Sequence, residues 1–534
     1  MKFDTIVVGA GIAGLTAAAY MAKAGKKVIL FERQHKVGGL IQTFQRDGVY
    51  FDGGLRSIEN SGIVFPMLKQ LGIEIEFHKS ITTIGVEDKV INISEKESLI
   101  DYEKFLQSLY PENADDIKAI VAEIRKIMGY MDILYGIDNP AFLDLKNDKD
   151  YLLKTILPWM FKFIFTVRKI AKLNEPVEEY LKRFTSNQSL IDIIAQHFFQ
   201  KTPASFALSY FSLYLDYHYP KGGTATLVES LEKYIVNNGG TIKTDVKIEV
   251  LNPEKKYIID NNGNQIAYDT LIWAGDQKHL YNSIPINEIS NNKLATKIQE
   301  KRDQLSPLKG GDSVYTIYLT VDKDVDYFRK ICSGHFFYTP LKDGLSKVSK
   351  KEIETFLNNE QMDADDTKAK EMVFDYLEKY FKLNTFEIAI PAIRDAALAP
   401  TGKTGLIVSL LFDYSLAKKI NDLGWTKEVK KFLEKLTIKI LNDTIFPDLE
   451  GSVIGCFSSS PLTIENLTGN TQGGITGWAF TNKNMPAVNK MLQVAKSVET
   501  ILPSVYQAGQ WVYSPSGMPI SILTGKLAAD KAMR

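Results

Sequence analysis

The sequence is poor in cysteine and histidine. It contains two cysteines, Cys332 and Cys456, and six histidines among 534 residues. The cysteines do not form a CxxC pair, and no two histidines stand at the spacing of paired metal ligands. We therefore predict no disulfide framework and no metal site, and we expect both thiols to be small buried side chains in a protein of a reducing compartment.

An excess of charge of one sign is also absent. Lysine and arginine together number 64, and aspartate and glutamate together number 64, so the formal net charge is zero. A neutral chain has no overall field that would attract a polyanion. Nucleic acid is therefore excluded as an expected partner, and any attraction to a membrane must come from a local patch of charge.

A long uncharged apolar run is missing as well. The densest apolar stretch, residues 151–174, is interrupted by Lys154, Pro158 and Lys162, and it falls far short of the roughly 20 residues that a membrane-spanning helix needs. Residues 1–4 lead directly into the first predicted strand, which leaves no room for a signal peptide. The expected location is cytoplasmic, with peripheral contact at the inner face of a membrane as the added hypothesis.

The composition is otherwise that of a globular protein, with 45% hydrophobic and 24% charged residues. A chain of 534 residues is too long for one hydrophobic core, so two or more domains are expected.

The first 32 residues contain a dinucleotide-binding motif in its full context. Residues 5–8 form a short β-branched run, which is typical of a buried parallel strand. Gly9, Gly11 and Gly14 follow and permit a tight turn, a close approach of the backbone to a pyrophosphate, and close packing of a helix on the strand. Residues 12–24 are mostly good helix formers, and a second strand ends at Glu32, whose carboxylate is placed to accept hydrogen bonds from an adenosine ribose.

A second glycine pair, Gly38 and Gly39, comes soon after Glu32 and Arg33. Glycines let the chain pass close to the far half of a long cofactor. The order from Glu32 to this pair, followed by Phe-Asp-Gly-Gly at residues 51–54, resembles the extended signature of FAD-dependent amine oxidases and polyene desaturases. This resemblance implies FAD rather than NAD as the cofactor.

Three later blocks carry the resemblance over nearly the whole chain. They are Tyr-Pro-Lys-Gly-Gly at residues 219–223 with the helix and strand that follow, the segment 390–403, and the segment 460–474. The tail, with Gly509 and the Ser-Gly-Met-Pro-Ile run at 516–520, is similar to the C-terminal FAD block. Together these blocks resemble the phytoene desaturase, carotenoid isomerase and retinol saturase group of flavoproteins. The chain departs from many relatives at Leu40, Trp511 and Tyr513, which leaves the substrate and the direction of the reaction open.

The resemblance implies an α/β fold in which an FAD-binding Rossmann-like domain of the glutathione-reductase and amine-oxidase type is joined to an α+β substrate domain that carries a helical lid. The expected FAD-binding domain comprises residues 1–80, 219–290 and 495–534. The expected lid comprises residues 81–218. The sheet of the substrate domain, with a helical excursion, is expected in residues 291–494. The implied cofactor-binding residues are Gly9, Ala10, Gly11, Ile12, Ala13, Gly14, Glu32, Arg33, Gly38, Gly39, Leu40, Gly54, Leu55, Arg56, Val246, Ala274, Gly509, Gly517, Met518 and Pro519.

Apolar residues recur at helical spacing from about residue 102 to 209, which predicts the lid. Within it, residues 151–174 contain five basic residues and no acidic one, and Leu153, Ile156, Leu157, Met160 and Ile164 are predicted to share one face. Such a helix lies in a membrane interface or packs in the protein core, and the spacing of its apolar residues does not separate the two. Two further predictions concern the substrate domain: residues 313–321 alternate as a half-buried strand does, and residues 346–383 are charged enough to be a solvated surface excursion.

The resemblance also implies a reaction that the flavin carries out, with the protein supplying orientation, a dry channel and local electrostatics. The implied substrate is a long apolar polyene or isoprenoid, which is desaturated, saturated or isomerised, and the electron donor or acceptor is not identified. A desaturase needs a base and a saturase an acid. The candidates for this role near the ring are Arg56, Glu59, His218, Tyr219 and Tyr513.

Two other classes of protein share the architecture. A flavin amine oxidase would need an aromatic cage, to which Trp511 and Tyr513 would contribute. A carrier of prenylated proteins or lipids, such as a GDP-dissociation inhibitor, would need no flavin at all, because a fold alone does not establish catalysis. The intact glycines at 9, 11 and 14 and the acid at 32 argue against the carrier.

Overall fold

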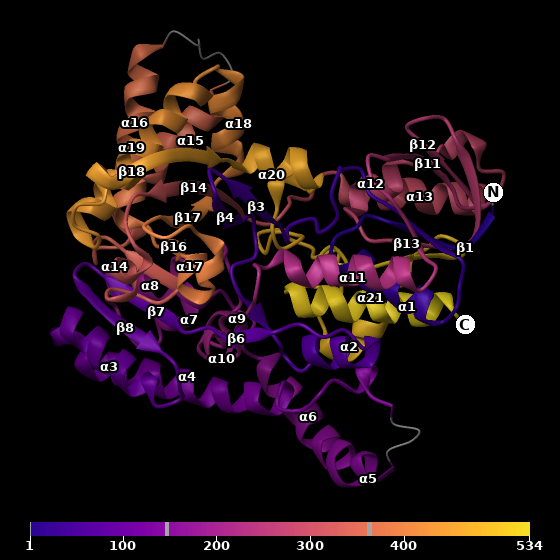
Figure 1. Cartoon of the computed structure of the whole chain (residues 1–534), viewed down its shortest axis with the longest axis horizontal. Helices are drawn as coiled ribbons and strands as arrows, with labels where there is room; N and C mark the ends of the chain where they lie inside the picture. The colour runs from indigo at the N-terminus through magenta and orange to yellow at the C-terminus, as the bar shows by residue number, and fades with distance from the viewer. Residues whose placement is uncertain (1, 145–148, 360–365) are drawn as a thin grey trace.

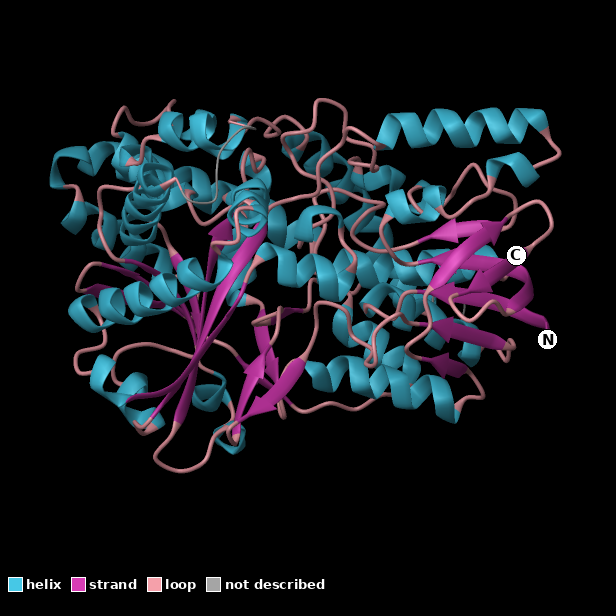
Figure 2. Ribbon diagram, turned by 90° about the horizontal axis from the view of Figure 1, so that it is seen from above, coloured by secondary structure: helices cyan, strands magenta, loops and turns pink. Residues whose placement is uncertain are grey.

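The computed structural model describes residues 2–144, 149–359 and 366–534. The chain forms two large β-sheets that lie toward opposite ends of the molecule, with helices around and between them (Figure 2). Both termini lie together at the end that holds the first sheet (Figure 1).

The first sheet begins with the strand predicted at the start of the chain. Its strand order is β10-β2-β1-β13-β12-β11, and β19 pairs with the far end of β13. The strands β10, β2, β1, β13 and β19 are parallel, whereas β11, β12 and the near end of β13 form an antiparallel meander. A hairpin turn at residues 260–263 connects β12 and β13, with Gly263 at a φ of +78°. The strands are β1 (Lys2–Val8), β2 (Val28–Phe31), β10 (Thr241–Lys243), β11 (Ile248–Asn252), β12 (Tyr257–Asp260), β13 (Gln265–Trp273) and β19 (Val505–Gln507).

Helices cover both faces of this sheet. On one face α1 (Ile12–Lys23) packs against both α11 (Ala225–Asn237) and α21 (Met518–Ala532), with α2 (Val64–Leu71) beside them. On the other face lie α12 (Gln277–Asn282) and α13 (Asn292–Leu305). Helix α13 falls within the range predicted for the substrate domain, but its apolar residues Leu294, Ile298 and Leu305 join the hydrophobic cluster of the first sheet.

The second sheet has the order β18-β14-β17-β16-β15-β7-β8. The strand predicted at residues 313–321 to be half-buried is a central strand of this sheet, and every residue in it except Val314 is buried. That prediction was wrong because Thr316 and Thr320, which are typical of a solvent face, lie under other elements. The strands are β7 (Thr82–Val86), β8 (Lys89–Ile93), β14 (Ser313–Val321), β15 (His335–Thr339), β16 (Phe386–Ala389), β17 (Thr404–Phe412) and β18 (Val453–Ser459).

A group of helices packs in the core of the second sheet, and all of them except α14 appear at the top left of Figure 1. The prediction of a solvated excursion at residues 346–383 was wrong for the described part of that segment, because α16 buries Val373, Leu377 and Phe381 in the core of this sheet. Charged residues cover only the outer side of the helix. The helices of this group are α14 (Val325–Arg329), α15 (Lys350–Asn358), α16 (Thr367–Leu383), α18 (Tyr414–Asp422) and α19 (Thr426–Thr444).

Both cysteines are free thiols in this half of the molecule. Cys332 is buried in the core of the second sheet, and Cys456 is half-buried on β18 and packs against the same core. Burial raises the pKa of each thiol to about 12. The prediction of a small buried side chain is confirmed for Cys332, whereas Cys456 is only half-buried.

The lid helices cover the β7–β8 end of the second sheet, along the lower edge of Figure 1. Their helical pattern is confirmed, and the predicted lid range also contributes β7 and β8 themselves. The helices are α3 (Ser98–Leu109), α4 (Ala114–Leu134), α5 (Lys149–Tyr151), a π-helical turn (Leu152–Ile156), α6 (Leu157–Ile170), α7 (Val177–Leu181), α8 (Gln188–Ala195), α9 (Ala204–Ala207) and α10 (Tyr210–Leu215).

Two small sheets lie between the large ones. The hairpin of β3 (Thr43–Arg46) and β4 (Val49–Asp52) places Val49 and Phe51 against Tyr318 and Ile407 of the second sheet. The other small sheet has the order β5-β9-β6, with β5 (Ile58–Glu59), β6 (Phe77–Lys79) and β9 (Tyr217–Pro220). The segments after the first glycine motif therefore join the two halves of the molecule.

Candidate cofactor site and active site

The glycine motif forms the predicted turn between β1 and α1. A Cβ atom built on Gly14 would lie 1.9 Å from the carbonyl oxygen of Gly9, so only glycine lets the helix pack this closely on the end of the strand. Gly9 itself has a φ of +96°, a region that favours glycine.

Gly11 has a different role. A Cβ built on it meets nothing within 4 Å, so glycine at this position leaves space free beside the backbone. Gly11 is the N-cap of α1, and no side chain caps the first turn, although Ile12 and Ala13 are buried. A helix start with uncapped N–H groups and open space next to it is suited to a phosphate.

Glu32 lies beside the glycine turn, at the end of β2. Its Oε2 accepts a hydrogen bond from the N–H of Ala10 at 2.8 Å, and its Oε1 accepts one from the N–H of Gln34 at 2.9 Å. The N–H of Val246 donates to the Glu32 carbonyl at 2.9 Å. Val246, an implied cofactor-binding residue, and Glu32, the predicted ribose acceptor, are thus adjacent. Arg33 points away from them and donates to the carbonyl of Asn466.

The second glycine pair packs directly on the first motif. The N–H of Gly38 donates to the carbonyl of Ala10 at 2.8 Å, and Gly38 pairs with Gly11 in an isolated parallel bridge. A Cβ on Gly54 would come within 2.1 Å of the Leu40 carbonyl oxygen, and the N–H of Leu55 donates to that carbonyl at 3.3 Å. Residues 38–40 and 53–55 therefore form one continuous wall next to the turn.

The C-terminal block closes the same region from the other side. A Cβ on Gly525 of α21 would lie 2.4 Å from the Ala13 carbonyl oxygen, and one on Gly509 would lie 3.3 Å from Ala13 Cβ. The N–H of Ala274, at the end of β13, donates to the carbonyl of Val8 at 2.8 Å. Helix α21 begins after Gly517 without a side-chain cap, with buried Met518 at its first turn.

Comparison with known families decides which cofactor this arrangement serves. The model of the family described as flavin containing amine oxidoreductase matches residues 12–346. This match covers more than half of the chain. The chain belongs to the flavin-containing amine oxidoreductase family. Its cofactor is FAD, and the open space at Gly11, the uncapped start of α1 and the carboxylate of Glu32 fit that cofactor.

Curated relatives are distant. The 4,4'-diapophytoene desaturase (4,4'-diaponeurosporene-forming) of Staphylococcus aureus strain COL is 21% identical over 558 aligned residues, which cover 99% of this chain and 98% of that protein. A protein named inactive all-trans-retinol 13,14-reductase from Danio rerio is 27% identical over 298 residues, which cover 52% of this chain and 45% of that protein. The chain thus spans less than half the length of the second relative.

Solved structures share the fold over the full length. An oxidoreductase from Methanosarcina mazei superimposes with a TM-score of 0.61 at 16% identity and covers 100% of both chains. Putrescine oxidase bound to putrescine gives a TM-score of 0.59 at 12% identity, covering 100% of this chain and 99% of that one. The predicted architecture, an FAD-binding Rossmann-like domain with a substrate domain, is confirmed.

The structure divides the five predicted acid or base candidates into separate groups. Glu59 of β5 is opposite Tyr217 of β9, and Ile58 is opposite His218. Because successive side chains of a strand point to opposite faces, Glu59 and His218 lie on different sides of this small sheet. His218 packs edge-on against Phe65, with ring centroids 4.9 Å apart, and its Nδ1 lies 2.9 Å from the Asp216 carbonyl oxygen.

Glu59 faces the start of α21. A Cβ built on Gly517 would lie 3.5 Å from Glu59 Oε1. Burial raises the pKa of Glu59 to about 7. Burial and, to a smaller extent, the charge of Glu59 raise the pKa of Tyr135 to about 12. Burial and, to a smaller extent, Tyr135 raise the pKa of Tyr513. Glu59, Tyr135 and Tyr513 therefore gather where the C-terminal FAD block begins, with a carboxyl group that titrates near neutrality.

Trp511 does not join this group. Its ring packs edge-on against Trp478 at 5.0 Å between centroids, and the Trp478 Nε1 donates to its carbonyl at 3.0 Å. Both rings are fully buried in the hydrophobic cluster of the first sheet. The aromatic cage suggested for an amine oxidase therefore lacks its tryptophan.

Arg56 and Tyr219 belong to a buried polar network instead. Tyr219 is fully buried, its hydroxyl donates to Asp52 Oδ2 at 2.7 Å, and the guanidinium of Arg394 stacks on its ring at 3.8 Å. Arg56 donates to the carbonyl of Asp52 and, through Nη2, to Ser409 Oγ at 2.9 Å. These contacts direct both side chains toward the second sheet, so they join the two halves of the molecule.

Asp52 is the centre of that network. Its buried carboxylate also accepts hydrogen bonds from the Thr43 hydroxyl at 2.8 Å and from the Thr224 N–H and hydroxyl at 3.1 and 2.9 Å. We expect Asp52→Ala to lower the free energy of unfolding by about 3 kcal/mol, because it leaves several buried donors unpaired. Urea denaturation measures the change, and Asp88→Ala at an exposed position is the control, for which a change within about 0.5 kcal/mol is expected. An equal effect of the two substitutions would contradict this role of Asp52.

A second buried cluster has no counterpart among the sequence predictions. His335 Nδ1 lies 3.0 Å from Ser57 Oγ, its Nε2 lies 2.9 Å from Glu387 Oε1, and Arg394 Nη1 donates to Ser57 Oγ at 3.2 Å. Burial lowers the pKa of His335; burial opposes ionisation of Glu387, but the hydrogen bond with His335 holds the pKa of that carboxyl below its usual value. A neutral histidine therefore donates to a carboxylate. No motif marks these residues, since they come from β15, β16 and the segment before β5.

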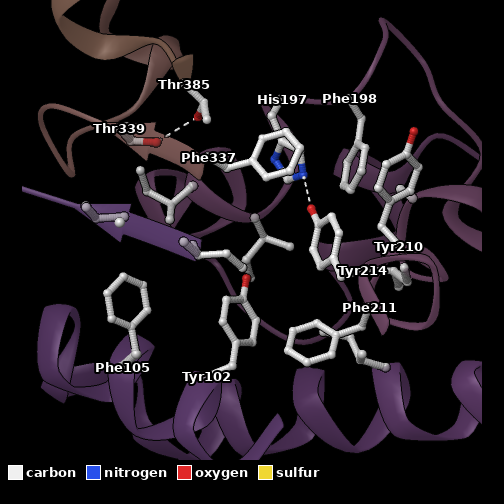
Figure 3. A pocket seen from close by; sticks show the side chains of 18 residues that line it. Tyr102, Phe105, His197, Phe198, Tyr210, Phe211, Tyr214, Phe337, Thr339 and Thr385 are labelled. Carbon is white, nitrogen blue, oxygen red and sulfur yellow. Dashed lines mark hydrogen bonds between the residues drawn. The ribbon is translucent and has the colours of Figure 1, made fainter. Parts of the chain in front are cut away.

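An apolar cavity lies between the lid and the second sheet. It holds about 590 Å³ of space free of atoms, part of which is open to solvent. Helices α3, α4 and α8–α10 line it from the lid, and β7 and β15 line it from the sheet. In Figure 3 the rings of Tyr102, Phe105, Phe211 and Phe337 surround this space, and His197 Nε2 and the Tyr214 hydroxyl, which face each other, are 3.2 Å apart.

None of the side chains that line the cavity carries a charge at neutral pH. The lining contains no aspartate, glutamate, lysine or arginine, and burial lowers the pKa of His197, its one histidine, to about 4. Four of its polar side chains are paired with one another: the hydroxyls of Thr339 and Thr385 lie 2.7 Å apart, and His197 Nε2 and the Tyr214 hydroxyl form the second pair. The cavity is therefore suited to an uncharged apolar molecule.

Aromatic rings connect the cavity with Glu59. Phe337 in the cavity wall contacts Tyr214 at 5.5 Å between centroids, Tyr214 contacts Tyr217 at 5.9 Å, and Tyr217 is opposite Glu59. We call Phe337, Tyr214 and Tyr217 the aromatic row. It leads from the apolar space to the carboxyl group at the start of α21.

Proposed function

We propose that this FAD-dependent oxidoreductase acts on the carbon–carbon double bonds of a long apolar polyene or isoprenoid. The observation that carries the proposal is the cavity, whose lining is aromatic or aliphatic and without charge. The full-length likeness to a protein named as a diapophytoene desaturase supports the same substrate class.

Amine oxidation is the second candidate, because the family and the fold include amine oxidases. An amine substrate arrives as a cation at neutral pH, and a buried cation needs a carboxylate or an aromatic cage. The cavity is rich in aromatic rings, but its lining contains no carboxylate that would neutralise a cation. Trp511, suggested for an aromatic cage, packs on Trp478 in the hydrophobic cluster of the first sheet instead. The missing carboxylate favours the hydrocarbon. A lipid carrier without flavin, the third candidate, does not explain the open space at Gly11 and the uncapped helix beside it.

We assign the proton transfer of this reaction to Glu59. Its pKa of about 7 makes both the acid and the carboxylate available near neutral pH, which is the condition for efficient general acid–base catalysis. When bound, FAD supplies the capacity to take up or return the electron pair of the neighbouring carbon. The aromatic row excludes water between the cavity and the carboxyl group and holds the chain of the substrate beside it.

The direction of the reaction determines the role of Glu59. In desaturation the carboxylate accepts the proton that leaves the hydrocarbon, whereas in saturation the protonated acid donates one. In isomerisation a proton taken up is returned, and the composition of the substrate is unchanged. The proposal covers all three directions.

Anaerobic incubation with candidate polyenes, once with oxidised and once with reduced flavin, tests the proposal and identifies the direction. The product mass falls by two hydrogens in desaturation, rises by two in saturation, and stays the same in isomerisation. A parallel incubation with putrescine and other primary amines, read by a peroxide assay, tests the second candidate. Turnover of amines without turnover of any polyene would overturn the proposal.

We expect Ala207→Trp to lower kcat/KM for long polyenes by about 100-fold, because the indole would fill space in the cavity that Ala207 lines. The matched control is Ala119→Trp on the exposed side of α4 in the same lid. Flavin content and thermal unfolding confirm that each variant is folded. Unchanged kinetics with long polyenes in folded Ala207→Trp would show that the substrate does not use this cavity.

A further inference from the structure

The segment from α5 to α6 is packed on one side only. On the inner side the Trp159 indole N–H donates to the carbonyl of Ile133 at 2.6 Å, and Phe163, Val167 and Ile170 pack against the lid core.

Ile156 is also buried on this inner side. The sequence predicts that it shares a face with Leu153 and Leu157, and that prediction is wrong because the turn at 152–156 is π-helical, which shifts the register of the faces.

The outer side carries a dense set of exposed apolar side chains. Phe161, Phe165 and Leu153 are 63%, 61% and 60% exposed, and Leu157 and Met160 are more than a third exposed. No other stretch of the described chain exposes as many large apolar residues in so short a span. In Figure 1, α5 and the start of α6 extend beyond the body of the molecule at the lower right.

Positive charge surrounds these apolar residues. The stretch 151–174 contains five basic residues and no acidic one. Lys162, Arg168 and Lys172 are exposed, and within the described ranges none of them forms an ion pair. A cluster of unpaired cations next to exposed phenylalanines is the pattern of a helix that lies in the interface of an anionic bilayer.

We propose that the outer face of α5–α6 docks on a membrane leaflet that contains anionic lipids. A second copy of the chain is a poorer occupant, because a self-complementary contact would bring Lys162, Arg168 and Lys172 of both copies together. In the described part of the chain no helix combines the length and the apolar character needed to cross a bilayer. The contact that we propose is with the surface of the leaflet, through side chains that insert at the level of the headgroups.

The lid gives this contact a connection with the active site. Phe163, Val167 and Ile170 on the inner side of α6 belong to the same hydrophobic cluster as the cavity residues Tyr102, Phe105 and Phe211. The inner side of α6 and the cavity therefore contact the same hydrophobic cluster of the lid.

Flotation with vesicles tests the proposal on the full-length protein. We expect binding to vesicles of phosphatidylcholine that contain a third of phosphatidylglycerol, weaker binding to phosphatidylcholine alone, and a loss of binding as salt is raised. The double substitution Phe161→Ser and Phe165→Ser should weaken partition by about tenfold or more. Lys162→Glu with Lys172→Glu should remove the preference for the anionic lipid.

Matched controls lie elsewhere on the surface. Val236→Ser with Ile454→Ser removes two apolar side chains that are each 54% exposed, and Lys293→Glu with Lys297→Glu reverses two exposed charges on α13. Neither pair should change vesicle binding. Equal vesicle binding of the parent protein and the α6 variants would overturn the proposal. Light scattering tests for a dimer. A dimer that dissociates in the Phe161→Ser and Phe165→Ser variant while vesicle binding is unaffected would also overturn the proposal. The assay does not depend on turnover, so its outcome is independent of the proposed reaction.

Discussion

Gly11→Val is expected to yield a folded, colourless protein. The Cβ position of residue 11 meets nothing within 4 Å and its φ is −69°, so valine is compatible with the backbone, and the cost at an N-cap position is about 1 kcal/mol. The added methyl groups occupy the space that the FAD phosphates need beside the start of α1. We expect binding of FAD to weaken by about 100-fold or more.

Titration of the apoprotein with FAD, followed by flavin fluorescence, measures this effect. Gly129→Val on α4 is the matched control, because a Cβ there also meets nothing within 4 Å and the position is remote from the glycine turn. The control should retain the parent's affinity. A yellow Gly11→Val protein with the parent's flavin content would show that the phosphates do not pass at residue 11.

Glu59→Gln is expected to lower kcat by about 10² to 10⁴-fold, since it removes the group that transfers the proton and keeps the size of the side chain. The pH profile gives a sharper test. With a pKa of about 7 for Glu59, desaturation, which needs the carboxylate, should accelerate as the pH rises through that value. Saturation, which needs the acid, should slow over the same interval. In the Glu59→Gln variant, the change of kcat with pH near 7 should be absent, whichever direction the reaction takes.

His218→Gln is the control for this experiment. His218 is next to Tyr217 in β9 but faces Phe65 on the other side of the small sheet, so its replacement should change kcat by less than about threefold. A large loss in His218→Gln together with an unchanged pH profile in Glu59→Gln would reverse the assignment of the two residues.

The FAD-binding half of the molecule was predictable because local rules determine it. A glycine whose Cβ would overlap a carbonyl oxygen, as at Gly14, is required wherever the strand, turn and helix occur in this order. The hairpin at residues 260–263 is equally local, since its turn residues specify the connection between two strands.

The second half depends on contacts between distant segments. The threonines of β14 are typical of a solvent-exposed face, but that strand is central in a sheet that other elements cover on both sides. The charged helix α16 is buried along one side because α19 packs against it. Helix α19 comes more than 40 residues later in the chain, so the sequence of α16 alone does not indicate this burial. The spacing of apolar residues indicates which residues share a face of a helix or strand, but it does not indicate whether solvent or another element covers that face.

Candidate acid and base residues show the same limit. Proximity to a glycine motif in sequence selected Arg56, Glu59, His218, Tyr219 and Tyr513, but strand alternation and the Asp52 network separate them in space. The cluster of His335, Glu387 and Ser57 comes from three segments without a shared motif, so only the fold brings it together.

The pairing of β1 with β13 affects how the protein is made. Lys2 is in register with Ala267, so the first strand leaves the ribosome long before its partner is synthesised, and its apolar residues Ile6 and Val7 remain without their final neighbours in the meantime. Contacts this distant in sequence form slowly and leave the nascent chain prone to aggregation. We expect flavin uptake only after α21 has packed against α1.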